Sequence, residues 1–328
     1  MGKSVIQVPR DREGEFEPIV VPKHQSRGLS IERLVISLYA KGMSVADIES
    51  EMQEIYGINL STSAISIITN KVSQAATEWQ NRPLDSLYMI VWMDGIVFKV
   101  RENGKVINKT VYLCVGLNKE GLKEVLGMWV GKNESAAFWM GVLTDLKARG
   151  VEDILITVTD NLNGFTETIK SVFPTSTTQI CVVHQIRNSC RYVVWKEKKE
   201  FTSDLKNIYN APTKEAAKME LENFEQKWGT KYPYAIRSWR NNWEELTVFF
   251  DFPVEIRKII YTTNLIENLN GKIRKYTKNK LSFPNDDALK KSVYLAITEI
   301  EKKWYQPIWN WALIFNQFIT IFENRIQV

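Results

Sequence analysis

Hydrophobic residues between positions 30 and 72 recur at three- and four-residue intervals, the spacing of one face of an α-helix. The pattern predicts three short helices, of which the first ends at Gly42. Ser44 and Asp47 form a capping-box pattern at the start of the second, and the third begins in the polar cluster Ser61–Ser63. Such an arrangement is typical of helix-turn-helix DNA-binding domains, although an ordinary helical cap without DNA contacts fits the pattern about as well.

The hydrophobic pattern changes near residue 86 to runs that are typical of β-strands. Residues 87–100, 109–118 and 122–131 are rich in Val, Tyr, Trp and Leu and are separated by turn-forming residues, which predicts an antiparallel meander. A helix, a strand, a second helix and a fifth strand at 178–183 are expected to follow. This is the order of elements in the ribonuclease-H-like fold, so we expect an α/β core whose strands are buried on both faces.

The remaining chain is predicted to be helical. Residues 184–255 combine charged helical patterns with several tryptophans and predict an all-α insertion, and the aromatic run at 304–322 is interpreted as a buried helix. The predicted domains are a polar lead-in (1–28), a helical, helix-turn-helix-like domain (29–83), a ribonuclease-H-like catalytic core in two parts (84–183 and 256–328) and the insertion between those parts (184–255).

Composition excludes several classes of protein. Hydrophobic residues make up 44% and charged residues 25% of the chain, enough for a packed core. Three cysteines are too few for a disulfide framework and favour a reducing compartment. We find no signal-peptide pattern and no run of about 20 apolar residues, so we expect a soluble, cytoplasmic protein without membrane contact. The net charge of +5 is compatible with nucleic acid but does not establish it.

Three acidic residues are candidates for a metal-dependent active site. Asp94 is predicted at the end of the first strand and Asp160 at the end of the fourth, and these strands are neighbours in a ribonuclease-H-like sheet. Glu267, on a basic helix, would be the third ligand, and the neighbouring Asn264 and Asn270 are expected to support the active site. Carboxylate oxygens suit Mg²⁺ or Mn²⁺, and a site for two such ions could promote phosphoryl transfer. Each residue alone is more often a turn, cap or solvated residue, so the prediction depends on their joint placement.

Further residues are expected to support this chemistry or to bind DNA. The segment from Gly271 to Lys280 has five basic residues and no acidic one, which predicts phosphate contacts, although a solvated helix face is the usual meaning of such a run. Cys181 and His184 form a C-x-x-H unit. With two histidines in the chain, packing near the active centre is favoured over a tetrahedral zinc site. The candidate DNA contacts are Lys272, Arg274, Lys275 and Lys278, together with Ser63 and Ser66 on the third predicted helix.

Five segments of the sequence are similar to a known family. They are VWMDGIVFKVRENGKV, VTDNLNGF, CVVHQIRN, SWRNNWEELTVFFDFP and YTTNLIENLNGKIRKYTK. In their order and separation they resemble the Mutator-type bacterial insertion-sequence transposases, and the similarity extends from about Val21 to the C-terminus. The resemblance implies a ribonuclease-H-like core with a helical insertion and a DDE triad of Asp94, Asp160 and Glu267. It also implies that Cys181 and His184 support the catalytic site and that Trp239 stacks on a flipped base near the cut.

The function that this resemblance implies is that of a DNA transposase. Such an enzyme would bind the terminal inverted repeats of its element, cleave the DNA with two metal ions and join the freed 3′-ends to target DNA. It would work in the bacterial nucleoid as a homodimer or larger complex on double-stranded DNA. Members of the family usually have more sequence before the segment resembling RDREGEFEP, so we expect part of the N-terminal DNA-binding region to be absent.

Two alternatives stay open at this point. One is a catalytically silent or truncated DNA-binding regulator derived from a transposase. The other is a different nuclease of the same fold, such as a junction resolvase or ribonuclease H.

Overall fold

The computed structural model describes residues 27–326 of the 328-residue chain. These residues form two compact units, divided between Thr69 and Asn70. The division falls inside the third helix. The predicted polar lead-in, residues 1–28, lies almost wholly outside the described residues, and the predicted domain boundaries stay predictions.

The N-terminal unit is helical, as predicted. It contains α1 (Arg27–Ala40), α2 (Val45–Glu54) and the first part of α3 (Thr62–Gln80). The Ser44 hydroxyl accepts a hydrogen bond from the Asp47 N–H, and the Asp47 carboxylate accepts one from the Ser44 N–H, so the capping box is confirmed. α3 is longer than expected because no glycine or proline interrupts the helical pattern before Pro83.

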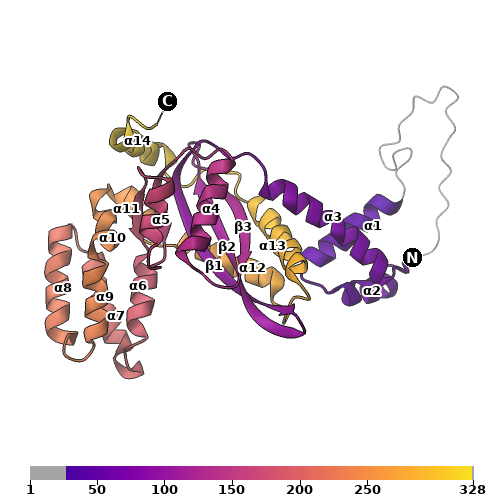
Figure 1. The fold of residues 1–328 in the computed structure, drawn as a ribbon, viewed down its shortest axis with the longest axis horizontal. Coiled ribbons are helices and arrows are strands. Elements are labelled where there is room, and N and C mark those ends of the chain that lie inside the picture. Colours follow the sequence, from indigo (N-terminus) through magenta and orange to yellow (C-terminus); the bar gives the residue numbers. More distant parts are fainter. Residues whose placement is uncertain (1–26, 327–328) are drawn as a thin grey trace. The chain divides into compact units, whose positions relative to one another are not determined.

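The larger unit is built on one five-stranded mixed sheet with the strand order β3-β2-β1-β4-β5 (Figure 1). The predicted antiparallel meander consists of β1 (Leu87–Glu102), β2 (Lys105–Leu117) and β3 (Lys123–Gly131). β4 (Asp153–Thr159) pairs parallel to β1, and β5 (Thr177–Ile180) pairs parallel to β4. The fold class is therefore α/β, as expected. β5 is shorter than predicted because the backbone turns into a helix directly after it.

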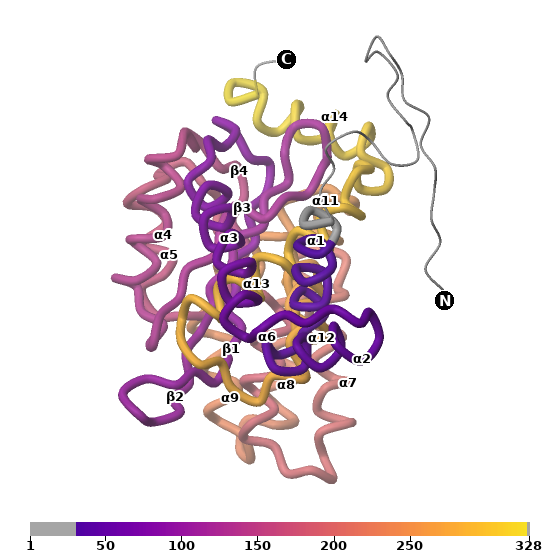
Figure 2. The backbone as a smooth tube through the Cα atoms, turned by 90° about the vertical axis from the view of Figure 1, so that its right-hand side faces the viewer, coloured from indigo at the N-terminus to yellow at the C-terminus, as the bar shows by residue number. Residues whose placement is uncertain are grey.

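The two faces of the sheet belong to two separate hydrophobic clusters. On one face α4 (Ala136–Ala148) and α5 (Phe165–Val172) cover the strands (Figure 1), and the rings of Trp139 and Phe165 stack with their centroids 4.7 Å apart. On the other face β1 packs against α12 (Asn264–Thr277), which in turn packs against α13 (Asp286–Glu301) (Figure 2). Burial on both faces explains why the core strands are nearly continuous apolar runs.

Between β5 and α12 the chain is helical, in agreement with the predicted all-α character of residues 184–255. Figure 1 shows α7, α8 and α9 side by side. Their core is aromatic, with Phe201 packed edge-on against Phe224, Trp228 and Tyr232. The elements of this segment are α6 (Val182–Cys190), a 3₁₀ turn (Trp195–Glu197), α7 (Lys198–Tyr209), α8 (Lys214–Trp228), α9 (Pro233–Asn241), α10 (Trp243–Thr247), a second 3₁₀ turn (Val248–Asp251) and α11 (Val254–Ile260).

The aromatic C-terminal run is only half buried, so the prediction of a buried helix is wrong. α14 spans Trp311–Phe322, and its buried residues are Ile314 and Phe318, whereas Leu313 is 50% exposed. An apolar run places hydrophobic residues on every face of a helix, so the run alone does not show which face the rest of the protein covers. Among residues 27–326, no helix combines the length and the apolar character that crossing a membrane requires.

Candidate active site

Asp94 lies in the middle of β1 rather than at its end, which corrects the prediction. β1 continues to Glu102 in antiparallel pairing with β2, and Asp94 pairs with Leu113. The parallel pairing of β1 with β4, however, ends at Trp92. The β4 side of β1 is therefore open at Asp94. Asp94 is 8% exposed, and its Oδ1 accepts a hydrogen bond from the Gly95 N–H at 2.8 Å.

Asp160 follows β4 directly, where the prediction placed it. β4 ends at Thr159, and a loop then leads to α5. The last paired residues of the two neighbouring parallel strands are Trp92 in β1 and Val158 in β4. Asp94 and Asp160 each lie two residues beyond that last pair. The register of the sheet thus brings both carboxyl groups to the same end of the two strands, as the sequence predicted.

α12 brings Asn270 and Glu267 to the same region. The Asn270 side-chain amide donates a hydrogen bond to Asp94 Oδ2 at 2.8 Å. Glu267 lies three residues earlier on the same helix face, in the first turn, where the helix N–H groups favour a negative charge. Asn264 is exposed at the start of the helix. Within the described residues, no contact joins its side chain to Asp94, Asp160 or Glu267, so its supporting role stays a prediction.

The C-x-x-H unit connects α6 to α12. Cys181 is fully buried immediately before α6, where its sulfur accepts a hydrogen bond from the Thr263 N–H at 3.3 Å and lies 3.2 Å from the Thr263 hydroxyl. His184, one turn into α6, places its Nε2 3.6 Å from Glu267 Oε1. Burial lowers the pKa of His184, so the imidazole is mainly neutral near pH 7. Cys181 thus holds the start of α12, and His184 lies beside the carboxylate of that helix.

Glu267 is bound by Arg187, which was not among the predicted site residues. Arg187 Nη1 donates to Glu267 Oε1 at 2.6 Å, and Nη2 donates to Oε2 at 2.8 Å. Across the part of the chain that the structure describes, no three Asp, Glu, His or Cys side chains are grouped closely enough to hold a metal ion. The structure therefore brings Asp94 and Asp160 to one end of the sheet and leaves Glu267 beside them, bound to the arginine. The sequence did contain a signal for Arg187: it follows His184 by three residues on a predicted helix, which places both side chains on the same helix face.

Desolvation makes the two aspartates unusually weak acids. It raises the pKa of Asp94 to about 7 and that of Asp160 to about 7. Nearby negative charges act in the same direction: Glu267 and Glu134 on Asp94, and Glu134 and Asp94 on Asp160. Glu134 is a second residue that the sequence analysis missed. It lies just before α4 and accepts a hydrogen bond from the Trp139 indole N–H at 2.9 Å.

The aspartate pair has the properties of a cation site. Within residues 27–326, Asp160 Oδ1 and Asn270 Oδ1 are both buried without a hydrogen-bond partner. A buried oxygen in this state costs free energy unless a cation or a proton satisfies it. Hard oxygen atoms of carboxylates and amides are the ligands that Mg²⁺ and Mn²⁺ prefer. These residues therefore fit such an ion by their chemistry and burial.

The predicted basic contacts are divided between two sides of α12. Arg274 and Lys278 follow Glu267 by seven and eleven residues, which places them within roughly 20° of it around the helix axis. Arg274 also packs over the Phe98 ring of β1 at 6.0 Å. Lys272 lies about 140° from Glu267 around the same axis. All four predicted cations, Lys272, Arg274, Lys275 and Lys278, have exposed side chains.

Trp239 is buried, which leaves its predicted contact with a base without structural support. The side chain is 2% exposed, and its indole N–H donates to the Ser189 hydroxyl at 3.0 Å. In this conformation neither face of the ring is open to a base, so stacking would require α9 to move. Ser63 and Ser66, by contrast, are exposed and lie one turn apart on α3. Their DNA contacts stay predictions.

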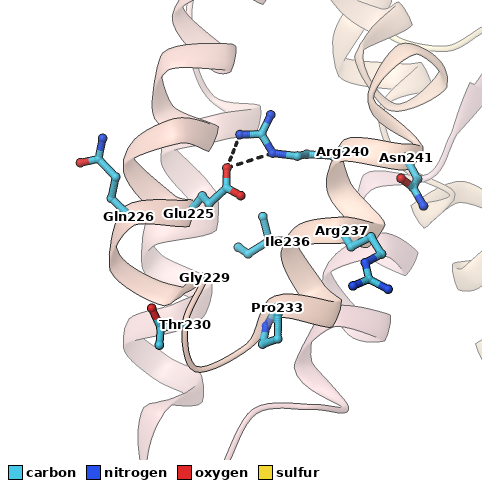
Figure 3. Close-up of a pocket in the computed structure, with 9 residues that line it drawn as sticks. All are labelled: Glu225, Gln226, Gly229, Thr230, Pro233, Ile236, Arg237, Arg240 and Asn241. Atoms are coloured by element: carbon cyan, nitrogen blue, oxygen red, sulfur yellow. Dashed lines mark hydrogen bonds and ion pairs between the residues drawn. The ribbon is translucent and has the colours of Figure 1, made fainter.

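An open pocket of about 630 Å³ lies between α8 and α9 (Figure 3). In Figure 3 Arg240 binds Glu225 across the pocket, while Arg237 points away from that pair. Neither the aspartates nor Glu267 line this pocket. We therefore place the candidate active site at the end of the sheet and not in this cavity.

Comparison of the sequence with known proteins shows the family of the chain. A sequence model described as "Transposase, Mutator family" matches residues 1–307. The chain belongs to the Mutator family of transposases. It is 42% identical over 324 residues to a probable transposase for insertion sequence element ISRM3-like of Sinorhizobium fredii, an alignment that covers 98% of this chain and 81% of that protein.

Two further relatives show how far the similarity extends. The transposase for insertion sequence element ISRM3 of Rhizobium meliloti is also 42% identical, over 98% of this chain and 81% of its own length. The transposase for insertion sequence element IS256 in transposon Tn4001 of Staphylococcus aureus is 26% identical, over 93% of this chain and 78% of its own length. In both alignments the similarity includes almost all of the chain rather than one motif.

Proposed function

We propose that this Mutator-family protein cleaves DNA at the terminal inverted repeats of an insertion sequence and joins the freed 3′-ends to target DNA. The observation that carries the proposal is a pair of aspartates beyond the last paired residues of two neighbouring strands, Asp94 buried and Asp160 partly buried, each with a pKa raised to about 7. Two carboxyl groups held this way are costly to the fold unless they bind a cation. Relatives named as insertion-sequence transposases at 42% identity support the substrate class.

The fold proposed for this activity is a ribonuclease-H-like core with an inserted helical segment, preceded by a helix-turn-helix-like domain. The strand order β3-β2-β1-β4-β5, with three antiparallel strands and two parallel ones, supports the first part. The all-helical chain from α6 to α11 supports the second. Exposed Ser63 and Ser66 on α3 support the third.

In the proposed mechanism, Asp94 and Asp160 hold the cations and Glu267 completes the site. Two Mg²⁺ or Mn²⁺ ions would activate the attacking water or 3′-hydroxyl and stabilise the leaving oxygen of the phosphodiester. The protein supplies orientation: the Gly95 N–H and the Asn270 amide each bind one oxygen of Asp94. Cys181 holds the start of α12, from which Glu267 projects one turn later.

DNA would approach this end of the sheet along the exposed cations of α12. Arg274 and Lys278 share the helix face of Glu267, so they are placed to contact phosphates near the cut, and Lys272 and Lys275 would contact DNA further around the helix. Because two transposon ends must be joined in one reaction, we propose that the protein acts on double-stranded DNA as a homodimer or larger complex. The proposed location is the bacterial cytoplasm, on the nucleoid.

The test is a cleavage and strand-transfer assay on a labelled duplex that carries the terminal inverted repeats, with and without Mn²⁺. The wild type should cut and join DNA only with the metal. Asp94→Asn and Glu267→Gln should each reduce the rates of cleavage and strand transfer by more than about 100-fold. Loss of a residue that only supports a metal ligand costs about 10- to 100-fold, and loss of the ligand itself should cost more. Glu152→Gln, which changes an exposed carboxylate before β4, is the matched control. Metal-dependent cleavage at the wild-type rate by Asp94→Asn would exclude the assignment, and binding without cleavage by the wild type would favour a regulator.

A further inference from the structure

Both carboxylate oxygens of Glu267 are committed to one guanidinium group. Arg187 forms two parallel hydrogen bonds, at 2.6 and 2.8 Å, the strongest arrangement that an arginine makes with a carboxylate. The other contacts of Glu267 Oε1 are longer: the Thr263 hydroxyl at 3.4 Å and His184 Nε2 at 3.6 Å. Held by this arginine, Glu267 does not form a cluster with Asp94 and Asp160 that is tight enough for a metal ion, as is true of every such group among the described residues.

The two helices that carry Arg187 and Glu267 are anchored to each other. α6 and α12 are joined at their N-terminal ends, where the Val182 N–H donates to the Tyr261 carbonyl at 3.0 Å and the Thr263 N–H donates to Cys181 Sγ at 3.3 Å. Arg187 and Glu267 project from these two joined helices. Because the helices are held together at their ends, we expect the charged groups to separate by side-chain rotation rather than by movement of the helices.

Arg187 is placed to contact a phosphate as well as a carboxylate. Its side chain is 55% exposed, whereas that of Glu267 is 22% exposed. The planar fork of a guanidinium group matches two phosphate oxygens as well as it matches two carboxylate oxygens. DNA that reaches the aspartates would therefore compete with Glu267 for the same donors.

We propose that Arg187 is a positioning residue that holds Glu267 away from Asp94 and Asp160 until a DNA phosphate replaces the carboxylate. The inference rests on the proposed function, because it requires DNA at this end of the sheet. DNA binding and cation binding are then coupled: the phosphate frees Glu267, and Glu267 completes the cation site. By thermodynamic reciprocity, the cation raises the affinity for DNA by the same factor.

The first test measures DNA binding in the presence of a chelator, with a fluorescein-labelled duplex as the probe. Glu267→Gln should bind about threefold to fivefold more tightly than the wild type, because DNA no longer competes with the carboxylate for Arg187. In an Arg187→Ala background, the same Glu267→Gln change should have little effect. If removal of the negative charge strengthens binding equally in both backgrounds, the proposal is overturned.

The second test measures Mn²⁺ binding without DNA. Arg187→Ala should bind Mn²⁺ about fivefold more tightly than the wild type, because Glu267 becomes free to join the aspartates. Arg187→Lys should be intermediate, since an ammonium group lacks the fork that holds both oxygens. Arg191→Ala, which removes an exposed cation one turn further along α6, is the matched control and should leave the affinity unchanged. Equal Mn²⁺ affinities for wild type and Arg187→Ala would overturn the proposal.

The two hypotheses fail in different ways. If none of the proteins binds the duplex, the proposed function fails together with this inference. If all of them bind it but neither coupling is seen, the positioning role of Arg187 fails alone.

Discussion

Replacement of Asp160 by asparagine is expected to remove a pH-dependent loss of stability from the metal-free protein. Burial raises the pKa of Asp160 from 3.8 to about 7. In the unfolded chain this carboxyl group loses its proton near the lower value, but in the folded protein it retains the proton up to the higher one. The unfolded state therefore binds fewer protons across this window, and the free energy of unfolding falls as the pH rises through it. Above the folded-state pKa the penalty is complete and stays constant.

The two pKa values give the size of this effect. With 3.8 in the unfolded chain and about 7 in the folded protein, the free energy of unfolding falls by about 3 kcal/mol between roughly pH 5 and pH 8. Asparagine does not ionise, so the variant lacks this contribution. The free-energy cost of burying the new asparagine amide does not depend on pH, so it cancels when the stabilities at two pH values are compared. Asp94 titrates in both proteins, and the repulsion between it and Asp160, which the variant lacks, acts in the same direction.

The assay is urea unfolding followed by tryptophan fluorescence, with a chelator present, for wild type and Asp160→Asn across this pH range. The stability of the variant relative to the wild type should increase by about 3 kcal/mol from the acidic to the alkaline end. Glu152→Gln, which changes an exposed carboxylate, should show no such trend. A difference between Asp160→Asn and wild type that stays constant with pH would refute the reasoning, because it would mean that the Asp160 carboxyl group ionises normally in the folded protein.

Three further predictions concern other parts of the chain. Ser44→Ala removes the hydroxyl that accepts a hydrogen bond from the Asp47 N–H, so it should destabilise the N-terminal unit by about 1 kcal/mol. Hydrogen exchange of the α2 amides measures this loss, and unchanged exchange would contradict the role of the capping box. Gly116→Ala places a Cβ 2.6 Å from Tyr88 Cδ1, so it should lower the free energy of unfolding in urea by about 1–3 kcal/mol. A variant as stable as the wild type would show instead that the Tyr88 ring can move aside. Lys278→Ala should reduce the slope of log affinity for DNA against log salt by about 1, whereas Lys302→Ala should not; equal slopes would place DNA away from α12.

The sequence was informative wherever a structural feature depends on neighbours along the chain. The helical spacing at the N-terminus, the Ser44–Asp47 capping box and the change to strand-like runs all come from contacts a few residues apart. Asp160 could be located because its strand is short and ends at the aspartate. Asp94 was assigned to the correct strand but to the wrong place in it, since the β1–β2 pairing continues beyond the part of β1 that pairs with β4.

The sequence was less informative about the side chains that surround the aspartates. Arg187 and Glu267 are 80 residues apart, and Asn270 and Asp94 are 176 apart, so neither pair has a local signal. The burial of Trp239 likewise depends on how α9 packs against Ser189 of α6. A tryptophan in a charged helical segment is compatible with either a buried or an exposed ring, and the packing of other helices decides between them.

The sequence alone therefore determined the order of helices and strands, the α/β class, the two aspartates and the resemblance to a transposase family. These depend on local periodicity, on turn and cap chemistry and on short motifs, which are properties of adjacent residues. Only the tertiary structure decided how the carboxyl groups are treated. It desolvates Asp94 and Asp160 enough to raise the pKa of each to about 7. It also pairs Glu267 with Arg187, so that Glu267 does not join the two aspartates in one cluster. Desolvation and long-range pairing are properties of the folded arrangement, and no local pattern encodes them.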